Sequence, residues 1–148
     1  MTTIIRDPGQ LFAPATVTVE HRPDGSRILR SPLAIGPVPA RLGEHLERWA
    51  AEAPERTFLA ERGADGAWQW VSYAEALARV RAVATWLLGQ NLSAERPVAV
   101  LSDNSVEHAI LMLAAMHIGV PVSAISQAYS LVSKDFAKLK SNISHITP

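Results

Sequence analysis

The residues whose types could carry out chemistry gather around one short segment, Ser102-Asp103-Asn104-Ser105, with His108 three residues further on. Ser105, His108 and Asp103 are the residue types of a nucleophilic triad. Ser105 and His108, however, stand one turn apart at the start of an expected helix. The sequence also lacks the glycine-flanked pattern of a nucleophile elbow. We therefore do not interpret these residues as a triad.

The same segment lies where α/β sheets bind ligands, because it follows an expected strand and opens an expected helix, whose amino terminus attracts anions. It contains no glycine that would let a phosphate approach the backbone, unlike the glycine-rich phosphate motifs. We expect helix capping here, with Asn104 as the capping residue and Glu107 bonding back to its backbone. Direct contact with a ligand is the alternative.

The histidines do not form a metal-binding pattern. His108 and His117 are nine residues apart, which at about 100° per residue puts them on opposite faces of one helix. His21, His45 and His145 are isolated and are expected at the surface. Cysteine is absent, which excludes disulfides, thiolate metal sites and cysteine nucleophiles. We assign no catalytic, cofactor-binding or metal-binding residue in this sequence.

Two further groups of residues have structural explanations. Trp68 and Trp70 point the same way from an expected strand and could stack bases, but no basic residues surround them in the sequence. We expect them to pack in the core or on a hairpin. Lys134, Lys138 and Lys140 are interpreted as a solvated helix face.

Composition excludes several classes of protein. The chain has 148 residues, of which 48% are hydrophobic and 19% charged, so it is not disordered and can bury a core. Fourteen basic residues balance fourteen acidic ones, which argues against a nucleic-acid or anionic-lipid partner. The amino terminus has no secretory pattern, and the lack of cysteine fits a reducing cytoplasm.

One uncharged stretch, from His108 to Ser133, approaches the length of about 20 residues that a membrane-spanning helix needs. Gly119 and Pro121 interrupt it and indicate a helix stop followed by a strand. We expect a buried helix and a buried strand here, with a membrane span as the alternative.

The first forty residues contain six of the ten prolines and are expected to form an extended arm, residues 1–40, that carries one hairpin. The hairpin strands are residues 16–20 and 27–30, on either side of the turn at 23–25. Apolar spacing then predicts a helix over 42–53, which Pro54 ends.

The next elements are a second hairpin, with strands at 57–60 and 67–71, and a helix that runs from Ser72 to Gly89. Ser72 and Glu75 have the spacing of a capping box, in which each side chain bonds the other residue's backbone N–H.

The carboxyl-terminal part of the sequence is typical of a parallel βαβ unit, with a strand at 97–102, a helix at 105–118 and a strand at 120–125. A last polar helix is expected over 133–141. The middle helix is apolar on most sides, so it must be covered on both faces, which indicates that more protein belongs around it. Its apolar residues are Val106, Ala109, Ile110, Met112, Leu113 and Met116.

Four motifs follow one another along the chain, at residues 46–57, 71–77, 96–105 and 114–121. Their order between about residues 42 and 140 resembles the amino-terminal part of the adenylate-forming acyl- and aryl-CoA synthetase superfamily. Residues 36–42 and 128–139 are most similar to the feruloyl-CoA synthetases in that superfamily, although Ser126-Gln127 replaces their common Asn-Pro.

This resemblance implies that the parent enzyme uses ATP and Mg²⁺ to adenylate a hydroxycinnamic or other aryl or acyl carboxylate and then transfers the acyl group to CoA. The superfamily's phosphate loop, its adenine- and magnesium-binding motifs and its catalytic lysine all come later than Pro148, and Lys134, Lys138 and Lys140 match none of them. The resemblance therefore implies an inactive amino-terminal fragment, in which residues 41–148 are an incomplete α/β subdomain of a larger adenylating domain. Its partner is the remainder of its own chain. A stand-alone α/β interaction module, or a homodimer, is the alternative.

Overall fold

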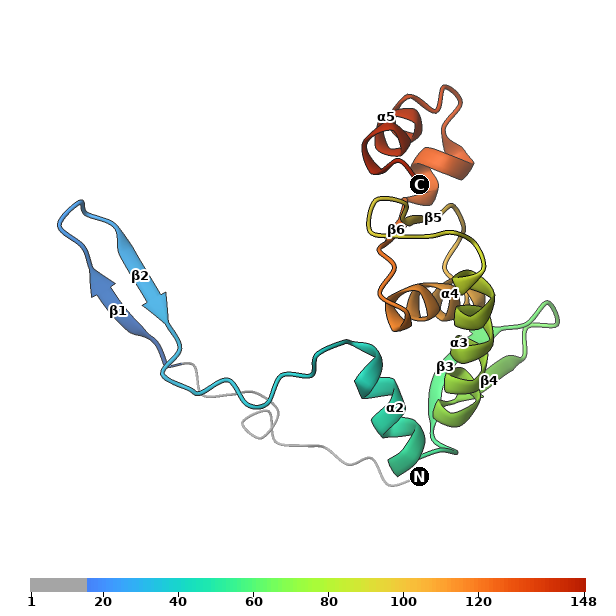
Figure 1. Cartoon of the computed structure of the whole chain (residues 1–148), viewed down its shortest axis with the longest axis horizontal. Helices are drawn as coiled ribbons and strands as arrows, with labels where there is room; N and C mark the ends of the chain where they lie inside the picture. Colours follow the sequence, from blue (N-terminus) through green and yellow to red (C-terminus); the bar gives the residue numbers. More distant parts are fainter. Residues whose placement is uncertain (1–15) are drawn as a thin grey trace. The chain divides into compact units, whose positions relative to one another are not determined.

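The computed structural model describes residues 16–148 (Figure 1). The chain divides by its internal contacts into two compact units, residues 1–38 and 39–148. Of the expected arm over 1–40, residues 1–15 lie outside the described residues. The rest of the first unit contains the predicted hairpin, formed by β1 (Thr18–His21) and β2 (Arg27–Arg30). The strands are antiparallel, and Gly25 allows the turn between them because it takes a φ of 83°.

The second unit begins with α2 (Gly43–Glu52), close to the predicted helix over 42–53. Its last turn closes with a hydrogen bond of 2.9 Å from the N–H of Ala53 to the carbonyl of Trp49. Pro54 follows directly and lacks the N–H that another turn would need. The helix buries Gly43 and Leu46 against the rest of the unit.

The second predicted hairpin is also present, as β3 (Thr57–Arg62) and β4 (Trp68–Ser72), which pair antiparallel. Its turn contains Gly66 with a φ of 77°, a conformation that side chains with a Cβ rarely adopt. The pairing shifts between Thr57 and Leu59. Only Val71 of these two strands is fully buried.

Helix α3 (Tyr73–Leu88) starts at the predicted position, because the Ser72 hydroxyl accepts a hydrogen bond of 3.2 Å from the N–H of Glu75. The other predicted bond of the capping box, from the Ser72 N–H to the Glu75 carboxylate, is wrong. The Glu75 carboxylate accepts a hydrogen bond of 2.5 Å from Arg79 instead. Residues four apart lie on the same face of a helix, so Arg79 competes with the Ser72 N–H for the Glu75 carboxylate.

The predicted βαβ unit is confirmed. Strands β5 (Val98–Val100) and β6 (Val122–Ala124) pair in parallel, and α4 (Val106–His117) connects them. Both strands are shorter than predicted. The hydrogen bond from the N–H of Ile125 to the carbonyl of Val100 continues the ladder past the end of β6.

The uncharged stretch from His108 to Ser133 divides among α4, β6 and a π-helical turn, η1 (Ala128–Val132). Gly119, with a φ of 76°, ends α4 as the sequence predicts. Across the described residues, no helix combines the length and the hydropathy that crossing a membrane requires.

The core of the second unit lies between α3 and α4, with α2 and the β3–β4 hairpin contributing one residue each (Figure 1). Alanines at Ala76, Ala84, Ala114 and Ala115 are at most 3% exposed, so the two helices pack closely. Val80, at the centre of α3, is completely buried. The other buried core residues are Leu46, Val71, Leu87, Val106, Ile110 and Val120.

The end of the chain differs from the prediction of one helix over 133–141. It forms the turn η1 and then α5 (Ala137–Ile146), so that Lys134 precedes the helix. Ser133 and Asp135 cap its start. The Ser133 hydroxyl accepts a hydrogen bond from the Phe136 N–H, and the Asp135 carboxylate accepts one from the Ala137 N–H. Phe136 has a φ of 54°, which prevents the helix from beginning earlier.

Candidate functional site

The segment after β5 starts helix α4 with a different cap from the one predicted. Ser105, and not Asn104, is the capping residue: its backbone is extended and its hydroxyl accepts a hydrogen bond of 3.1 Å from the N–H of His108. The helix begins at Val106, one residue later than the Asn104 cap requires. The hydroxyl of Ser105 therefore lies where it can reach the third helical N–H.

A residue that sequence analysis missed provides a second cap. Glu61, on β3, accepts a hydrogen bond of 2.9 Å from the N–H of Val106 through its Oε2 atom. The two residues are 45 positions apart, so no local pattern could reveal the contact. Only the packing of the β3–β4 hairpin against the start of α4 brings them together.

This cap decides what the start of α4 can bind. The free N–H groups and the dipole of a helix favour an anion at its amino terminus. Here the carboxylate of Glu61 already takes that place, and a phosphate at the same position would be repelled by its charge. The start of α4 therefore does not fit the triphosphate of ATP.

Ser102, rather than Ser105, contacts the His108 ring. Its Oγ lies 2.8 Å from His108 Nδ1 and donates a hydrogen bond of 3.1 Å to the Asp103 carbonyl. His108 Nδ1 is also 3.3 Å from the same carbonyl. Asp103 thus contributes its backbone carbonyl to this cluster. Of the other residues considered for a triad, Ser105 caps α4 and the His108 ring contacts Ser102.

A hollow of about 220 Å³ lies at the carboxyl ends of β5 and β6. One side comes from the segment between β5 and α4, and the other from the residues around the end of β6. The lining residues are Ser102, Asn104, His108, Ala124, Ile125, Ser126 and Gln127.

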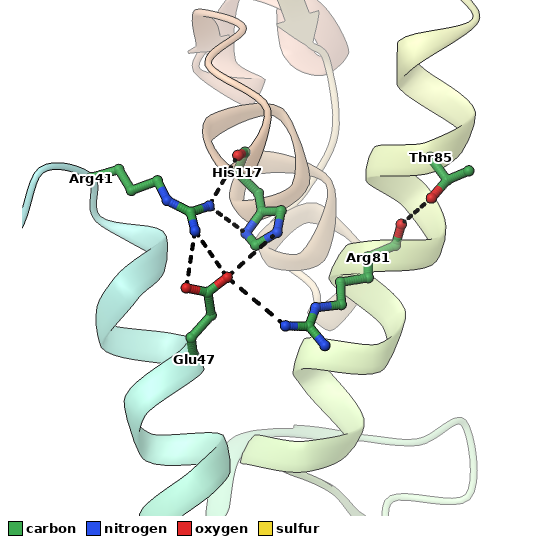
Figure 2. A network of polar contacts seen from close by, with 5 residues as sticks. All are labelled: Arg41, Glu47, Arg81, Thr85 and His117. Atoms are coloured by element: carbon green, nitrogen blue, oxygen red, sulfur yellow. Dashed lines mark hydrogen bonds and ion pairs between the residues drawn. The ribbon is translucent and has the colours of Figure 1, made fainter.

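His117 belongs to a separate polar network at the other end of α4 (Figure 2). Arg41 donates two hydrogen bonds, of 3.0 and 3.1 Å, to the carboxylate of Glu47 on α2, and a third of 3.4 Å to the His117 carbonyl. His117 Nε2 and the Arg81 guanidinium on α3 lie 3.8 and 3.9 Å from Glu47 Oε1. Glu47 thereby links α2, α3 and α4.

His108 and His117 accordingly have different partners at opposite ends of one helix. Within residues 16–148, no three histidine, aspartate or glutamate side chains come together in a way that could hold a metal ion.

Trp68 and Trp70 pack on the surface of their hairpin, and the alternative of a core position is wrong. Their rings are 5.8 Å apart between centroids, and their residues are 48% and 60% exposed. The guanidinium of Arg62, directly across from Trp68 on β3, lies 4.3 Å from that ring. The arginine stacks on the exposed indole and covers part of it.

The fold and these contacts define a mixed α/β segment. Residues 39–148 combine a parallel strand pair and an antiparallel hairpin with a helical core, and the first unit contains another antiparallel hairpin. Residues 46–137 match the family of AMP-binding enzymes, and the chain belongs to this family. No curated protein sequence matches the chain.

Solved structures share the fold. The crystal structure of IdnL1 aligns with a TM-score of 0.63 and 25% identity, over 76% of this chain and 22% of that one. CmiS6 aligns with a TM-score of 0.63 and 21% identity, over 77% of this chain and 27% of that one. A fatty acyl-adenylate ligase from L. pneumophila aligns with a TM-score of 0.62 and 14% identity, over 73% of this chain and 19% of that one. The α/β fold expected from the sequence is confirmed, and the chain spans about a quarter or less of these proteins.

Proposed function

We propose that this chain forms the amino-terminal part of the adenylating domain of an AMP-forming acid–thiol ligase. The observation that carries the proposal is the match of residues 46–137 to the AMP-binding enzymes, because it includes both the helical core and the βαβ unit. In this proposal, the chain supplies helices and strands against which the rest of the domain packs.

The contacts of the described residues support a structural role. The start of α4 is closed by Ser105 and Glu61, and the Arg41–Glu47 network ties three helices together. ATP, Mg²⁺ and CoA are therefore assigned to other parts of the ligase. Bound there, they supply an activated acyl phosphate anhydride and the thiol that accepts the acyl group.

The proposed substrate is a hydroxycinnamic acid such as ferulic acid, with other aryl or acyl carboxylates as the wider class. The support for this choice is the similarity of residues 36–42 and 128–139 to feruloyl-CoA synthetases. We propose a cytoplasmic enzyme whose partners are the remainder of its own chain and these small molecules.

The deciding experiment is to sequence the source transcript beyond the codon for Pro148. An open reading frame that continues into a loop rich in glycine, serine and threonine with a lysine would support the ligase. A stop codon directly after Pro148 would overturn the proposal in favour of a stand-alone interaction module. In that case, sedimentation at several concentrations would show whether the chain dimerises.

We also expect the purified 148-residue chain to form no feruloyl-CoA from ferulate, ATP and CoA. The physical reason is that the phosphate charge of the reaction needs cations and oriented donors, and the start of α4 offers a carboxylate instead. Thioester formation can be followed by absorbance, with a complete CoA ligase as the positive control. ATP-dependent turnover that survives repurification would contradict the structural role.

A further inference from the structure

The hollow at the carboxyl ends of β5 and β6 combines polar side chains from two loops. Five of its seven lining residues have polar side chains, and none is Asp, Glu, Lys or Arg. The ends of parallel strands are where α/β sheets place ligands, because loops from neighbouring strands converge there. The polar residues are Ser102, Asn104, His108, Ser126 and Gln127.

The His108 ring is held in a fixed orientation. Its Nδ1 atom lies 2.8 Å from Ser102 Oγ and 3.3 Å from the Asp103 carbonyl. Within residues 16–148, its Nε2 atom has no hydrogen-bond partner. The ring is thus anchored through one nitrogen, and the other remains available to a ligand.

Two carboxamides are also available. In the described part of the chain, the side chains of Asn104 and Gln127 make no hydrogen bond to protein, and both residues are exposed. Each carboxamide offers a carbonyl acceptor and an NH₂ donor. They come from opposite sides of the hollow, Asn104 from the loop after β5 and Gln127 from the residues after β6.

These groups select a class of ligand. An anion is disfavoured because Glu61 and Ser105 already accept from the N–H groups of Val106 and His108 at the adjacent helix start. A cation has no carboxylate among the lining residues to bind. An apolar ligand would remove water from carboxamides and hydroxyls without replacing their hydrogen bonds. A hydroxyl group both donates and accepts, so it can pair with every polar group in the hollow.

We propose that this hollow binds a neutral, hydroxyl-rich group of the size of a pentose. In this arrangement, two adjacent hydroxyl groups of the ligand bridge the carboxamides of Asn104 and Gln127, and a third hydroxyl of the ligand forms a hydrogen bond with Nε2 of His108. The site is open on one side, so its affinity for a free sugar is low, with a dissociation constant in the millimolar range. The proposal does not depend on the ligase assignment, because it uses only contacts among residues 102–127 and the hydrogen bond from the Val106 N–H to Glu61.

The test is a titration of the isotope-labelled 148-residue chain with D-ribose, followed by NMR. We expect saturable shifts of the His108 ring and of the side-chain amides of Asn104 and Gln127. Gln127→Ala should weaken binding by about fivefold, which corresponds to the loss of one net hydrogen bond. Gln127 is exposed and its side chain has no partner in the described residues, so this variant is expected to fold; Gln90→Ala, outside the hollow, is the matched control.

Two other probes separate this class of ligand from the alternatives. Tetrahydropyran, a ring without hydroxyl groups, and inorganic phosphate should leave these signals unchanged. The proposal is overturned if D-ribose gives no saturable shift, if tetrahydropyran or phosphate binds equally well, or if Gln127→Ala and Gln90→Ala bind D-ribose with the same affinity.

Discussion

At the scale of single residues, Glu61 and Asp135 show how carboxylates close helix ends in this chain. Glu61 reaches the start of α4 from a distant strand, whereas Asp135 caps α5 from two residues before the helix. Both accept a backbone N–H that has no partner inside its helix. The first depends on tertiary packing, and the second on local sequence alone.

Glu61→Ala should lower the free energy of unfolding by about 1 to 2 kcal/mol, because the Val106 N–H loses a charged acceptor in a partly buried place. Urea denaturation of the 148-residue chain measures this difference. Glu61→Gln should lose less stability, since its side-chain carbonyl can still accept a hydrogen bond from the Val106 N–H. Glu55→Ala, at an exposed position, is the control, and an equal loss in both alanine variants would argue against the cap.

The pKa of Asp135 should lie below its ordinary value of 3.8, because the Ala137 N–H and then the Ser133 hydroxyl donate to the carboxylate. A lowered pKa in the folded state favours folding above the unfolded pKa. That contribution is lost as the pH falls through the folded pKa, below 3.8. An NMR titration of the side-chain carboxyl carbon measures it, and Ser133→Ala should move the pKa back towards 3.8. An unchanged pKa in this variant would exclude the hydroxyl as a cause.

At the scale of elements, three helices are joined by one carboxylate. Glu47 on α2 contacts Arg41 before its own helix, Arg81 on α3 and His117 at the end of α4 (Figure 2). The Arg41 guanidinium also bonds the His117 carbonyl, where the negative end of the helix dipole favours a cation. The network complements the apolar contacts between these helices.

Glu47→Gln should destabilise the chain by about 1 kcal/mol, a modest loss because the Glu47 side chain is 28% exposed and its pairs are partly screened. The loss should shrink in concentrated salt. Glu52→Gln, at the exposed end of the same helix, is the control. In a double-mutant cycle, Arg41→Ala and Glu47→Gln should be less than additive. Full additivity would show that the two side chains do not interact.

At the scale of the whole molecule, the stability of residues 39–148 rests on the close packing of α3 against α4. Small residues let the two helices approach, and Val80 fills the centre of the interface. An apolar hollow of about 440 Å³ also lies on these helices, lined in part by Ala82, Val83 and Leu111.

Val80→Ala should cost about 2 kcal/mol, from the two lost methyl groups and the cavity they leave. Thermal and urea unfolding of the complete chain provide the measurement. Val132→Ala, at a position that is 72% exposed, should change the stability little. Equal effects of the two substitutions would contradict the packing of α3 against α4 as the centre of the core.

The sequence by itself determined the order of the elements up to β6, the end of α4 at Gly119 and the parallel βαβ unit. These features depend on apolar periodicity, glycine and proline, which act within a few residues. The sequence-based prediction failed where two local donors compete for one acceptor, because the Glu75 carboxylate accepts from Arg79 in place of the Ser72 N–H. Only the tertiary structure decided that Glu61 closes α4, because this contact joins a strand and a helix that are 45 residues apart. Such contacts depend on how whole elements pack, and no residue spacing along the chain encodes that packing.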